Sequence, residues 1–542
     1  MQHDFPLTLQ HVRDRARTLY ADSQIVSVRD GERSRASYGE VVERADRLAA
    51  ALSGLGVGPG DRVATFMWNT REHFEVYLAV PCMGAVLHTL NVRLFAEQLT
   101  YIVNHAEDRV IVVDSSLVPV LEGLAPTFES VRHYLVVGDG DTGSLPDALR
   151  YEELLADQSG GFEYPELDER QAAGLCYTSG TTGNPKGVLY SHRSKLLHAL
   201  GQCMADSMGL RADDRVMPVV PMFHANAWGI PYGSATCGAD LIMPGADLTA
   251  GALCKLITEE RVTFSAAVPT IWMDLLRYAD EHRPDLSGMR LVISGGSAVP
   301  LTLMQELEQR HGLRIMQAWG MTETSPLGSV ARPPGDAEDD EHWRYRATAG
   351  RPSPLVEARI VDDDGAEVLW DGQSTGELQV RGPWVANAYF RDDESEAKFD
   401  AGWLRTGDIA AIDERGYIRI SDRAKDVIKS GGEWISSVEL EVEIMAHPAV
   451  LEAAVIAVPH ERWGERPLAC VVPEEDAELT LEELREHLSD RVAKWWVPDE
   501  LAIVDEVPKT SVGKFDKKVL RKRLEEGGLE TVSGSAGSST PA

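Results

Sequence analysis

Cysteine is scarce in this chain, with six residues among 542, and no two of them form a Cys-x-x-Cys pair. Structural zinc sites usually need closely spaced cysteine or histidine ligands, and disulfide frameworks belong to small, cysteine-rich secreted domains. The sequence argues against both. Dispersed cysteines in a long chain instead favour a cytoplasmic protein in a reducing compartment.

Positive charge is also in short supply. The chain has 53 Lys and Arg against 86 Asp and Glu, which gives a formal net charge of −33. A surface this acidic repels nucleic acid and anionic lipid, so we expect neither as a partner. The few cations must therefore be concentrated wherever an anionic ligand binds.

Long apolar runs are absent. The most apolar stretch, residues 77–90, is interrupted by Pro81 and His88 and is too short to span a bilayer. The first residues show no basic segment followed by an apolar one, so we expect no signal peptide and no integral membrane segment.

Two common catalytic patterns are missing as well. There is no Gly-x-Ser-x-Gly elbow of a serine hydrolase and no Walker phosphate loop. A Gly-x-Gly-x-x-Gly sequence occurs at 138–143, but its two aspartates would repel a pyrophosphate. We interpret it as an acidic turn and not as a dinucleotide site.

The order of expected elements predicts an α/β fold. A helix opened by Ser37, a strand over 62–68 and a helix over 71–80 begin an alternation that continues to about residue 296. Such alternation indicates parallel sheets covered by helices. From about residue 346, short strands and turns predict a β-rich subdomain.

A new unit is expected to begin near Asp422. Its strands and helices predict a small C-terminal α+β domain. The Ser/Gly-rich end of the chain is expected to be disordered. The predicted domains are 1–421, 422–528 and a tail of 529–542.

The strongest local signal is residues 177–188, YTSGTTGNPKGV. Glycines let backbone N–H groups approach an anion closely, the hydroxyl groups add donors, and Lys186 supplies a positive charge. Apolar residues on both sides place the loop between core elements. Its chemistry is that of a phosphate-binding loop.

With this loop and five further motifs, the sequence resembles the adenylate-forming superfamily of acyl-CoA synthetases, luciferases and peptide-synthetase adenylation domains, from about residue 10 to about 525. The further motifs are QAWGMTET at 317–324, GELQVRG at 376–382, WLRTGD at 403–408, DRAKDVIKSGG at 422–432 and PKTSVGK at 508–514. PMFHANAWGIPY at 221–232 and DVIKSGGEWISSVELE at 426–441 look most like bacterial medium- and long-chain fatty acyl-CoA ligases.

The resemblance implies a site for ATP and Mg²⁺. Trp319 would flank the adenine, Asp408 would accept the ribose hydroxyls, and Glu323 with Thr178 would hold the metal, which prefers hard oxygen ligands. The residues that it implies for nucleotide binding are Thr178, Ser179, Gly180, Thr181, Thr182, Gly183, Lys186, Gly296, Ser297, Gln317, Ala318, Trp319, Gly320, Thr322, Asp408, Arg423, Lys425, Lys429 and Trp434.

The resemblance marks Lys514 as the lysine that bridges the substrate carboxylate and the α-phosphate during adenylation. An ammonium between two reacting anions stabilises the charge that develops. The small C-terminal α+β domain would then be a mobile lid, and Asp422 is the candidate hinge that lets it deliver and withdraw this lysine. The active site is expected in the cleft between the two domains.

For the acyl group, the resemblance implies a pocket formed by His224, Trp228, Gly295 and Gly296. His224 would lie beside the carboxylate and Trp228 would gate the acyl tunnel. On its own, an imidazole in an apolar stretch is more often a hydrogen-bonded core histidine. The predicted catalytic residues are Lys514, His224, Glu323 and Thr178.

The predicted function is ATP-dependent ligation of a medium- or long-chain fatty acid to coenzyme A, through an acyl-adenylate, with release of AMP and pyrophosphate. Alternatives are a methylmercaptopropionate- or aryl-acid-CoA ligase and acyl transfer to a carrier protein. A luciferase-like oxygenase and a non-catalytic binder are more remote. The resemblance also suggests a homodimer.

Overall fold

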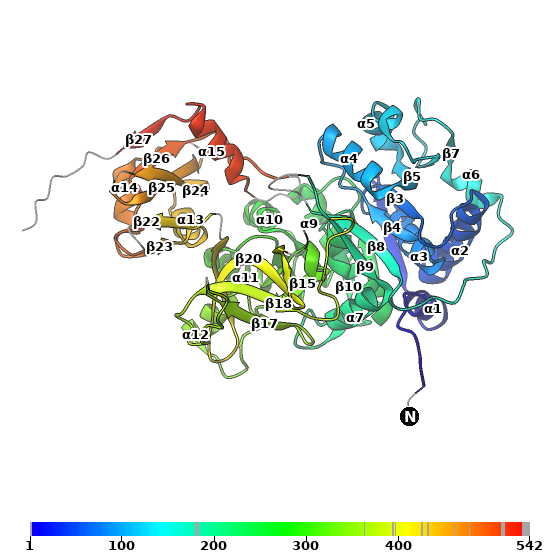
Figure 1. Cartoon of the computed structure of the whole chain (residues 1–542), viewed down its shortest axis with the longest axis horizontal. Coiled ribbons are helices and arrows are strands. Elements are labelled where there is room, and N and C mark those ends of the chain that lie inside the picture. Colours follow the sequence, from blue (N-terminus) through cyan, green and yellow to red (C-terminus); the bar gives the residue numbers. More distant parts are fainter. Residues whose placement is uncertain are drawn as a thin grey trace, which may run out of the picture. The chain divides into compact units, whose positions relative to one another are not determined.

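The structure is a computed structural model that describes residues 3–178, 184–362, 364–392, 395, 397–423, 426–430, 433–460, 462–475, 477–510 and 515–533. The chain divides into two compact units (Figure 1). The first comprises residues 1–299, 303–358 and 380–404, and the second comprises residues 300–302, 359–379 and 405–542.

The first unit contains a sheet of seven described strands in the order β7-β6-β5-β3-β4-β8-β9, parallel except for β9. Its strands are β3 (Arg62–Phe66), β4 (Val86–Thr89), β5 (Asp108–Asp114), β6 (His133–Val137), β7 (Ala148–Arg150), β8 (Ala172–Tyr177) and β9 (Gly187–Ser191). The associated helices are α2 (Tyr38–Gly54), α3 (Arg71–Cys82), α4 (Ala96–Ala106), α5 (Val118–Glu122) and α6 (Tyr151–Ala156).

A second sheet of the described chain has nine strands in the order β16-β15-β14-β13-β12-β10-β11-β1-β2, and its central run from β14 to β1 is parallel. Its strands are β1 (Gln24–Arg29), β2 (Glu32–Ser37), β10 (Arg215–Pro218), β11 (Asp240–Met243), β12 (Phe264–Ala267), β13 (Leu291–Gly295), β14 (Ile315–Gly320), β15 (Leu327–Val330) and β16 (Arg351–Pro352). The associated helices are α1 (Gln10–Thr18), α7 (His192–Cys203), α8 (Ile230–Cys237), α9 (Ala250–Glu259), α10 (Pro269–His282), α11 (Leu301–His311) and α12 (Asp339–Arg346).

The predicted helix start at Ser37 is confirmed in detail. Ser37 caps α2, and its hydroxyl accepts from the backbone N–H of Glu40 while the Glu40 carboxylate accepts from the Ser37 backbone. This reciprocal pair satisfies two donors that a helix start would otherwise leave without partners. Residues 138–143, the predicted acidic turn, form bends and a turn between β6 and β7.

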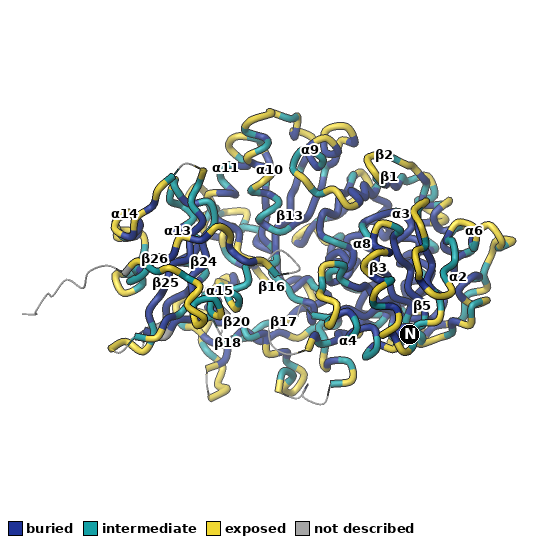
Figure 2. The backbone as a smooth tube through the Cα atoms, turned by 90° about the horizontal axis from the view of Figure 1, so that it is seen from above, coloured by how far each residue is buried: buried dark blue, intermediate teal, exposed yellow. Residues whose placement is uncertain are grey.

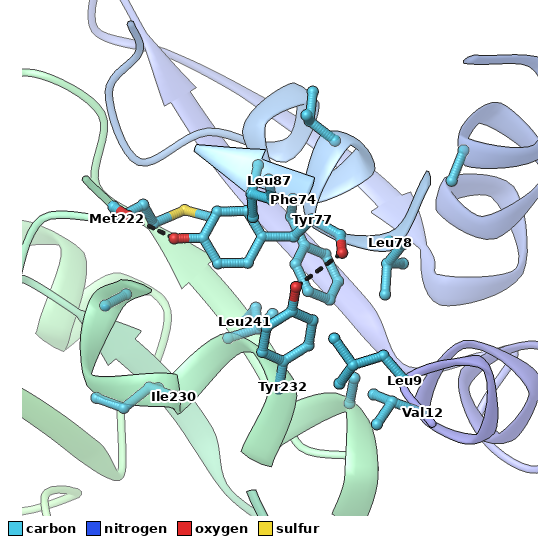
Figure 3. Close-up of a cluster of buried hydrophobic side chains, with 14 of the residues drawn as sticks. Leu9, Val12, Phe74, Tyr77, Leu78, Leu87, Met222, Ile230, Tyr232 and Leu241 are labelled. Atoms are coloured by element: carbon cyan, nitrogen blue, oxygen red, sulfur yellow. Dashed lines mark hydrogen bonds between the residues drawn. The ribbon is translucent and has the colours of Figure 1, made fainter. Parts of the chain in front are cut away.

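The sheets carry the core, as the buried strands in Figure 2 show. One apolar cluster joins α3 to the segments around β10 and α8 (Figure 3). Within it the Tyr232 hydroxyl donates to the backbone carbonyl of Tyr77 over 2.9 Å, and the Tyr77 hydroxyl donates to the carbonyl of Met222. Both phenols are buried and both have an acceptor, as buried phenols require.

A third sheet, in the order β17-β18-β20-β19 with β21 beside β20, confirms the predicted β-rich subdomain. Its strands are β17 (Glu357–Val361), β18 (Gly376–Arg381), β19 (Phe399–Asp400), β20 (Trp403–Ile412) and β21 (Ile418–Arg423). The fourth sheet has the order β23-β22-β25-β26-β27, with β24 beside β25. It comprises β22 (Ile428–Ser430), β23 (Glu433–Ile435), β24 (Val450–His460), β25 (Gly464–Pro473), β26 (Glu500–Ile503) and β27 (Thr531–Ser533), with α13 (Ser437–Met445), α14 (Leu481–Leu488) and α15 (Lys517–Glu525).

One part of the predicted tail is wrong. Residues 531–533, which composition places in a disordered segment, form β27 and pair antiparallel with β26. The open edge of β26 supplies the hydrogen-bond partners that a short polar segment cannot find by itself. Residues 534–542 lie outside the described residues. No helix in the described ranges is long and apolar enough to cross a membrane.

Candidate active site

Three predicted site segments follow parallel strands of the same sheet. The chain leaves β10 into residues 219–229, leaves β13 into Gly296 and Ser297, and leaves β14 into Thr322 and Glu323. Open parallel sheets bind ligands at the carboxyl ends of their strands. The predicted loop after Tyr177 likewise begins at the carboxyl end of β8.

The base of that loop is closed by two hydrogen bonds. The Thr178 N–H donates to the Lys186 carbonyl over 2.9 Å, and the Lys186 N–H donates to the Thr178 hydroxyl over 3.1 Å. These bonds fix where the loop leaves and rejoins the sheet. Its remaining predicted residues, Ser179, Gly180, Thr181, Thr182 and Gly183, lie outside the described residues.

Lys186 and Glu323 are brought together by Tyr389, a residue that the sequence motifs did not predict. The Tyr389 hydroxyl donates to Glu323 Oε1 over 2.6 Å, and the Lys186 ammonium lies 5.1 Å from the centre of the tyrosine ring. Lys186 also pairs with Asp392, Nζ to Oδ2, over 3.0 Å. Burial, with the nearby Glu323 carboxylate, raises the pKa of Tyr389 above its ordinary range, so the phenol stays a donor.

Glu323 lies in a short 3₁₀ turn, Thr322–Thr324, directly after β14. The turn is held from outside, because the Tyr190 hydroxyl donates to the Thr322 carbonyl over 2.7 Å and the Ala386 N–H donates to the Glu323 carbonyl over 2.7 Å. Glu323 is only 5% exposed. It is a buried carboxylate on a fixed backbone.

These groups fit a magnesium ion that shares its ligands with a nucleotide. Within the described ranges no three His, Cys, Asp or Glu side chains gather into a metal cluster. Magnesium commonly takes only one or two protein oxygens and completes its shell with phosphates and water. Glu323 uses Oε1 for Tyr389, and no described residue donates to its Oε2. Glu323 thus keeps one oxygen with which it would hold the ion, and Thr178 beside it stays a prediction.

The predicted adenine segment runs along the end of β14. The side-chain amide of Gln317 is held in one orientation, because its Oε1 accepts from the Val299 N–H over 2.7 Å and its Nε2 donates to the Thr348 carbonyl over 2.9 Å. The Trp319 ring covers Gly328, where an added methyl group would lie 2.3 Å from Trp319 Cζ3. Only a glycine at 328 leaves room for this ring position. Ala318, Trp319 and Gly320 are half-buried.

Two of the four predicted acyl residues, Trp228 and Gly295, lie side by side. A methyl group added at Gly295 would lie 3.4 Å from Trp228 Cη2, so the indole is next to the end of β13. Trp228 is 7% exposed, and His224 is half-buried. Gly296 has a φ of 91°, which favours glycine, and Ser297 is exposed. The fold therefore places Trp228 beside Gly295, two residues that are 67 positions apart in the chain.

In the second unit, Asp408 and Arg423 are cross-strand partners in β20 and β21. Asp408 is 3% exposed, and its N–H donates to the Thr406 hydroxyl over 3.1 Å. Lys429 and Trp434 are partners in the β22–β23 hairpin. Two further predicted residues, Lys425 and Lys514, lie outside the described residues.

The predicted hinge residue Asp422 is held by a buried network. Asp422 Oδ2 accepts from the Ser437 backbone N–H over 2.6 Å, and the Ser437 hydroxyl accepts from the Lys517 ammonium over 2.5 Å. Lys517 also pairs with Glu441, Nζ to Oε1, over 2.7 Å, and Glu441 Oε1 accepts from the Val455 N–H. The start of α15 is thereby tied to the end of β21.

The chain matches known proteins over nearly its whole length. The AMP-binding enzyme family matches residues 13–390, and the AMP-binding enzyme C-terminal domain matches residues 439–514. A long-chain-fatty-acid–CoA ligase of Thermus thermophilus is 45% identical, with 96% of each chain covered. A medium-chain-fatty-acid–CoA ligase of Ectopseudomonas oleovorans is 43% identical, covering 95% of this chain and 96% of that protein.

A 3-methylmercaptopropionyl-CoA ligase of Ruegeria lacuscaerulensis is 44% identical, covering 96% of this chain and 98% of that protein. Among solved structures, the anthranilate CoA ligase AuaEII in complex with anthranoyl-AMP matches with a TM-score of 0.87 at 26% identity. That match covers 97% of this chain and 99% of the other.

Proposed function

The chain belongs to the AMP-binding enzyme family, and we propose that it joins a medium- or long-chain fatty acid to coenzyme A at the cost of ATP. The family membership confirms the resemblance predicted from the motifs. The observation that carries the substrate class is the similarity, over 95–96% of this chain, to two fatty-acid–CoA ligases.

The reaction has two displacement steps. The substrate carboxylate attacks the α-phosphorus of ATP, which forms the acyl-adenylate and releases pyrophosphate. The coenzyme A thiolate then attacks the acyl carbonyl, which forms the thioester and releases AMP. Neither step needs a covalent bond to the protein, so the enzyme acts by positioning its substrates and by stabilising charge.

Each described group has a task in this scheme. The Lys186 ammonium, held by Asp392, offers positive charge to the phosphates beside the loop that starts at Thr178. Tyr389 fixes one oxygen of Glu323 and leaves the other oxygen for a metal ion. Magnesium bound there would neutralise phosphate charge. Trp228 and Gly295 provide apolar contacts for the acyl group.

The roles of the second unit rest on the predicted motifs. Asp408 is proposed to accept the ribose hydroxyls, and Lys514 to bridge the carboxylate and the α-phosphate during adenylation. In support, Asp408 is buried on a paired strand, and α15 begins three residues after Lys514 at the network around Asp422. The boundary at 421/422, a homodimer and a cytoplasmic location remain proposals.

The test is AMP release with ATP, Mg²⁺ and coenzyme A across a panel of acids, namely propionate, methylthiopropionate, octanoate, myristate, palmitate, benzoate and an amino acid. We expect coenzyme-A-dependent turnover that peaks at octanoate or a longer chain. A peak at methylthiopropionate would favour the second candidate, which the 44% identical relative supports. AMP release without thioester formation would contradict transfer to coenzyme A and favour a carrier protein.

A further inference from the structure

Five successive residues between β10 and α8 have a left-handed backbone, and only the last is glycine. The φ angles of Ala225, Asn226, Ala227 and Trp228 lie between 37° and 54°, and that of Gly229 is 73°. Residues other than glycine adopt this region rarely and one at a time, because their Cβ then approaches the backbone. A run of this kind persists only where the surroundings hold it in place. We refer to residues 225–229 as the left-handed turn.

The turn is held by the side chain of its second residue, Asn226, which is fully buried. Asn226 Nδ2 donates to the Thr89 hydroxyl on β4 over 3.2 Å, and Asn226 Oδ1 accepts from the Lys195 ammonium on α7 over 2.5 Å. The Thr89 hydroxyl in turn donates to the Phe223 carbonyl over 3.4 Å. The amide thus connects the turn to two other elements of the same unit.

The chain on either side of the turn is fixed as well. The Met222 N–H donates to Asn69 Oδ1 over 2.7 Å, and the Met222 carbonyl accepts from the Tyr77 hydroxyl (Figure 3). At the other end, Gln202 Nε2 donates to the Trp228 carbonyl. Among the side chains that hold the turn and its flanks, Lys195 carries a positive charge.

Lys195 is an unusual residue to find here. It is 2% exposed, and burial lowers the pKa of its ammonium to about 8. An ammonium has three donors, yet Asn226 is its one hydrogen-bond acceptor among the described residues, and the Tyr190 ring, 3.8 Å from Nζ, adds a cation–π contact. No described carboxylate pairs with it. Burying a cation costs free energy that one hydrogen bond and one ring contact offset only in part, so Lys195 lowers the stability of the fold. This points to a role in function.

We propose that Lys195 is a positioning residue for acid selection. Through Asn226 it fixes the left-handed turn, and with it the spacing between His224, which precedes the turn, and Trp228, which lies within it. This inference rests on the proposed function, since it concerns which acids that site accepts. Lys195 acts through Asn226 and does not itself touch the substrate.

The test compares wild type with Lys195→Met, which keeps the length of the side chain but removes its charge and donors. The readout is kcat and KM for each acid of the panel, together with KM for ATP. We expect KM for the preferred acid to rise about tenfold, because one charge-assisted hydrogen bond is lost. The preference for one chain length over others should weaken. KM for ATP should change less than KM for the acid, since Lys195 hydrogen-bonds to the turn directly and reaches the Thr322 carbonyl only through Tyr190. Lys255→Met, an exposed lysine on α9, is the matched control.

Asn226 provides a second, independent comparison. Asn226→Leu removes the acceptor and should reproduce the Lys195→Met profile, and the double variant should be no worse than either single one. Asn226→Asp keeps the acceptor for Lys195 and tolerates left-handed backbone but loses the donor to Thr89, so its acid selectivity should lie closer to wild type than that of Asn226→Leu. If Lys195→Met fails to fold, Asn226→Leu against Asn226→Asp decides the question.

The inference is overturned if both variants keep the wild-type acid profile and only melt at a lower temperature, which is what a purely structural role would give. That failure differs from failure of the proposed function. If wild type releases AMP with no acid of the panel, the proposed function is contradicted, and so is this inference. If wild type turns over an acid of the panel and both variants keep its acid profile, the proposed function holds and only this inference is contradicted.

Discussion

Tyr389 donates a hydrogen bond of 2.6 Å to the carboxylate of Glu323, although the two residues are 66 positions apart in the chain. The ammonium of Lys186 lies 5.1 Å from the centre of the same ring. One phenol therefore sets the geometry of both the predicted metal ligand and the predicted phosphate-binding lysine.

Tyr389→Phe should lower the adenylation rate about tenfold, because the buried Glu323 carboxylate loses its one described hydrogen-bond donor. The measurement is acid-dependent exchange of pyrophosphate into ATP. Tyr278→Phe on α10 is the control, since this ring stacks on the exposed His282. Equal exchange rates for Tyr389→Phe and wild type would show that the contact is dispensable.

Lys514→Ala should abolish adenylation and leave transfer from a supplied acyl-adenylate to coenzyme A largely intact. The reason is that the proposed ammonium bridges two anions in the first step only. The two half-reactions are measured separately, by pyrophosphate exchange and by thioester formation. A similar loss in both steps would contradict the assigned role.

Lys517→Met should destabilise the C-terminal part of the chain by about 3–5 kcal/mol, because it leaves the buried Glu441 carboxylate without its cation. Burial already raises the pKa of Glu441. Denaturant unfolding measures the change, and Lys518→Met, at the exposed neighbouring position, is the control. If the two variants unfold alike, the ion pair contributes no net stability. If Lys517→Met is destabilised as expected, its combination with Glu441→Leu should recover part of the loss, because both charges are gone.

Stability should fall as the pH drops from about 6.5 to about 4. His73 is fully buried, and burial lowers its pKa to about 4, while its ring nitrogens contact the Trp68 carbonyl and the Thr65 hydroxyl. The unfolded chain therefore binds a proton in this window that the folded chain does not, which favours unfolding by up to about 3 kcal/mol.

The measurement is the free energy of unfolding at several pH values for wild type and for His73→Gln. The variant should show a shallower slope between pH 6.5 and 4, whereas a change at the exposed His282 should leave the slope as it is. Parallel slopes for wild type and His73→Gln would rule out this histidine as a cause of acid instability.

Much of this architecture could be predicted, because the relevant signals are local. Ser37 followed by Glu40 is a capping pattern that needs no tertiary contact, and the loop from Thr178 to Lys186 is recognisable from its chemistry alone. Alternating helices and strands predicted the parallel sheets. Motif order predicted the family.

What the sequence did not reveal depends on packing. Tyr389 and Asp392 lie in the stretch NAYFRDD, which reads as an ordinary loop until the fold brings it beside Lys186. Lys195 sits in a helix where an unpaired lysine is normally exposed, and only the structure shows that it is buried against Asn226. The strand at 531–533 depends on an open edge that no local pattern predicts.

The network that joins Asp422 to Lys517 has a consequence for protein engineering. Its members, Asp422, Ser437, Glu441 and Lys517, all follow residue 421. A chimera joined at 421/422 would inherit the whole network from one parent, whereas a crossover between residues 423 and 436 would separate Asp422 from its partners. The choice of junction should therefore decide whether an exchanged C-terminal module keeps its native internal contacts.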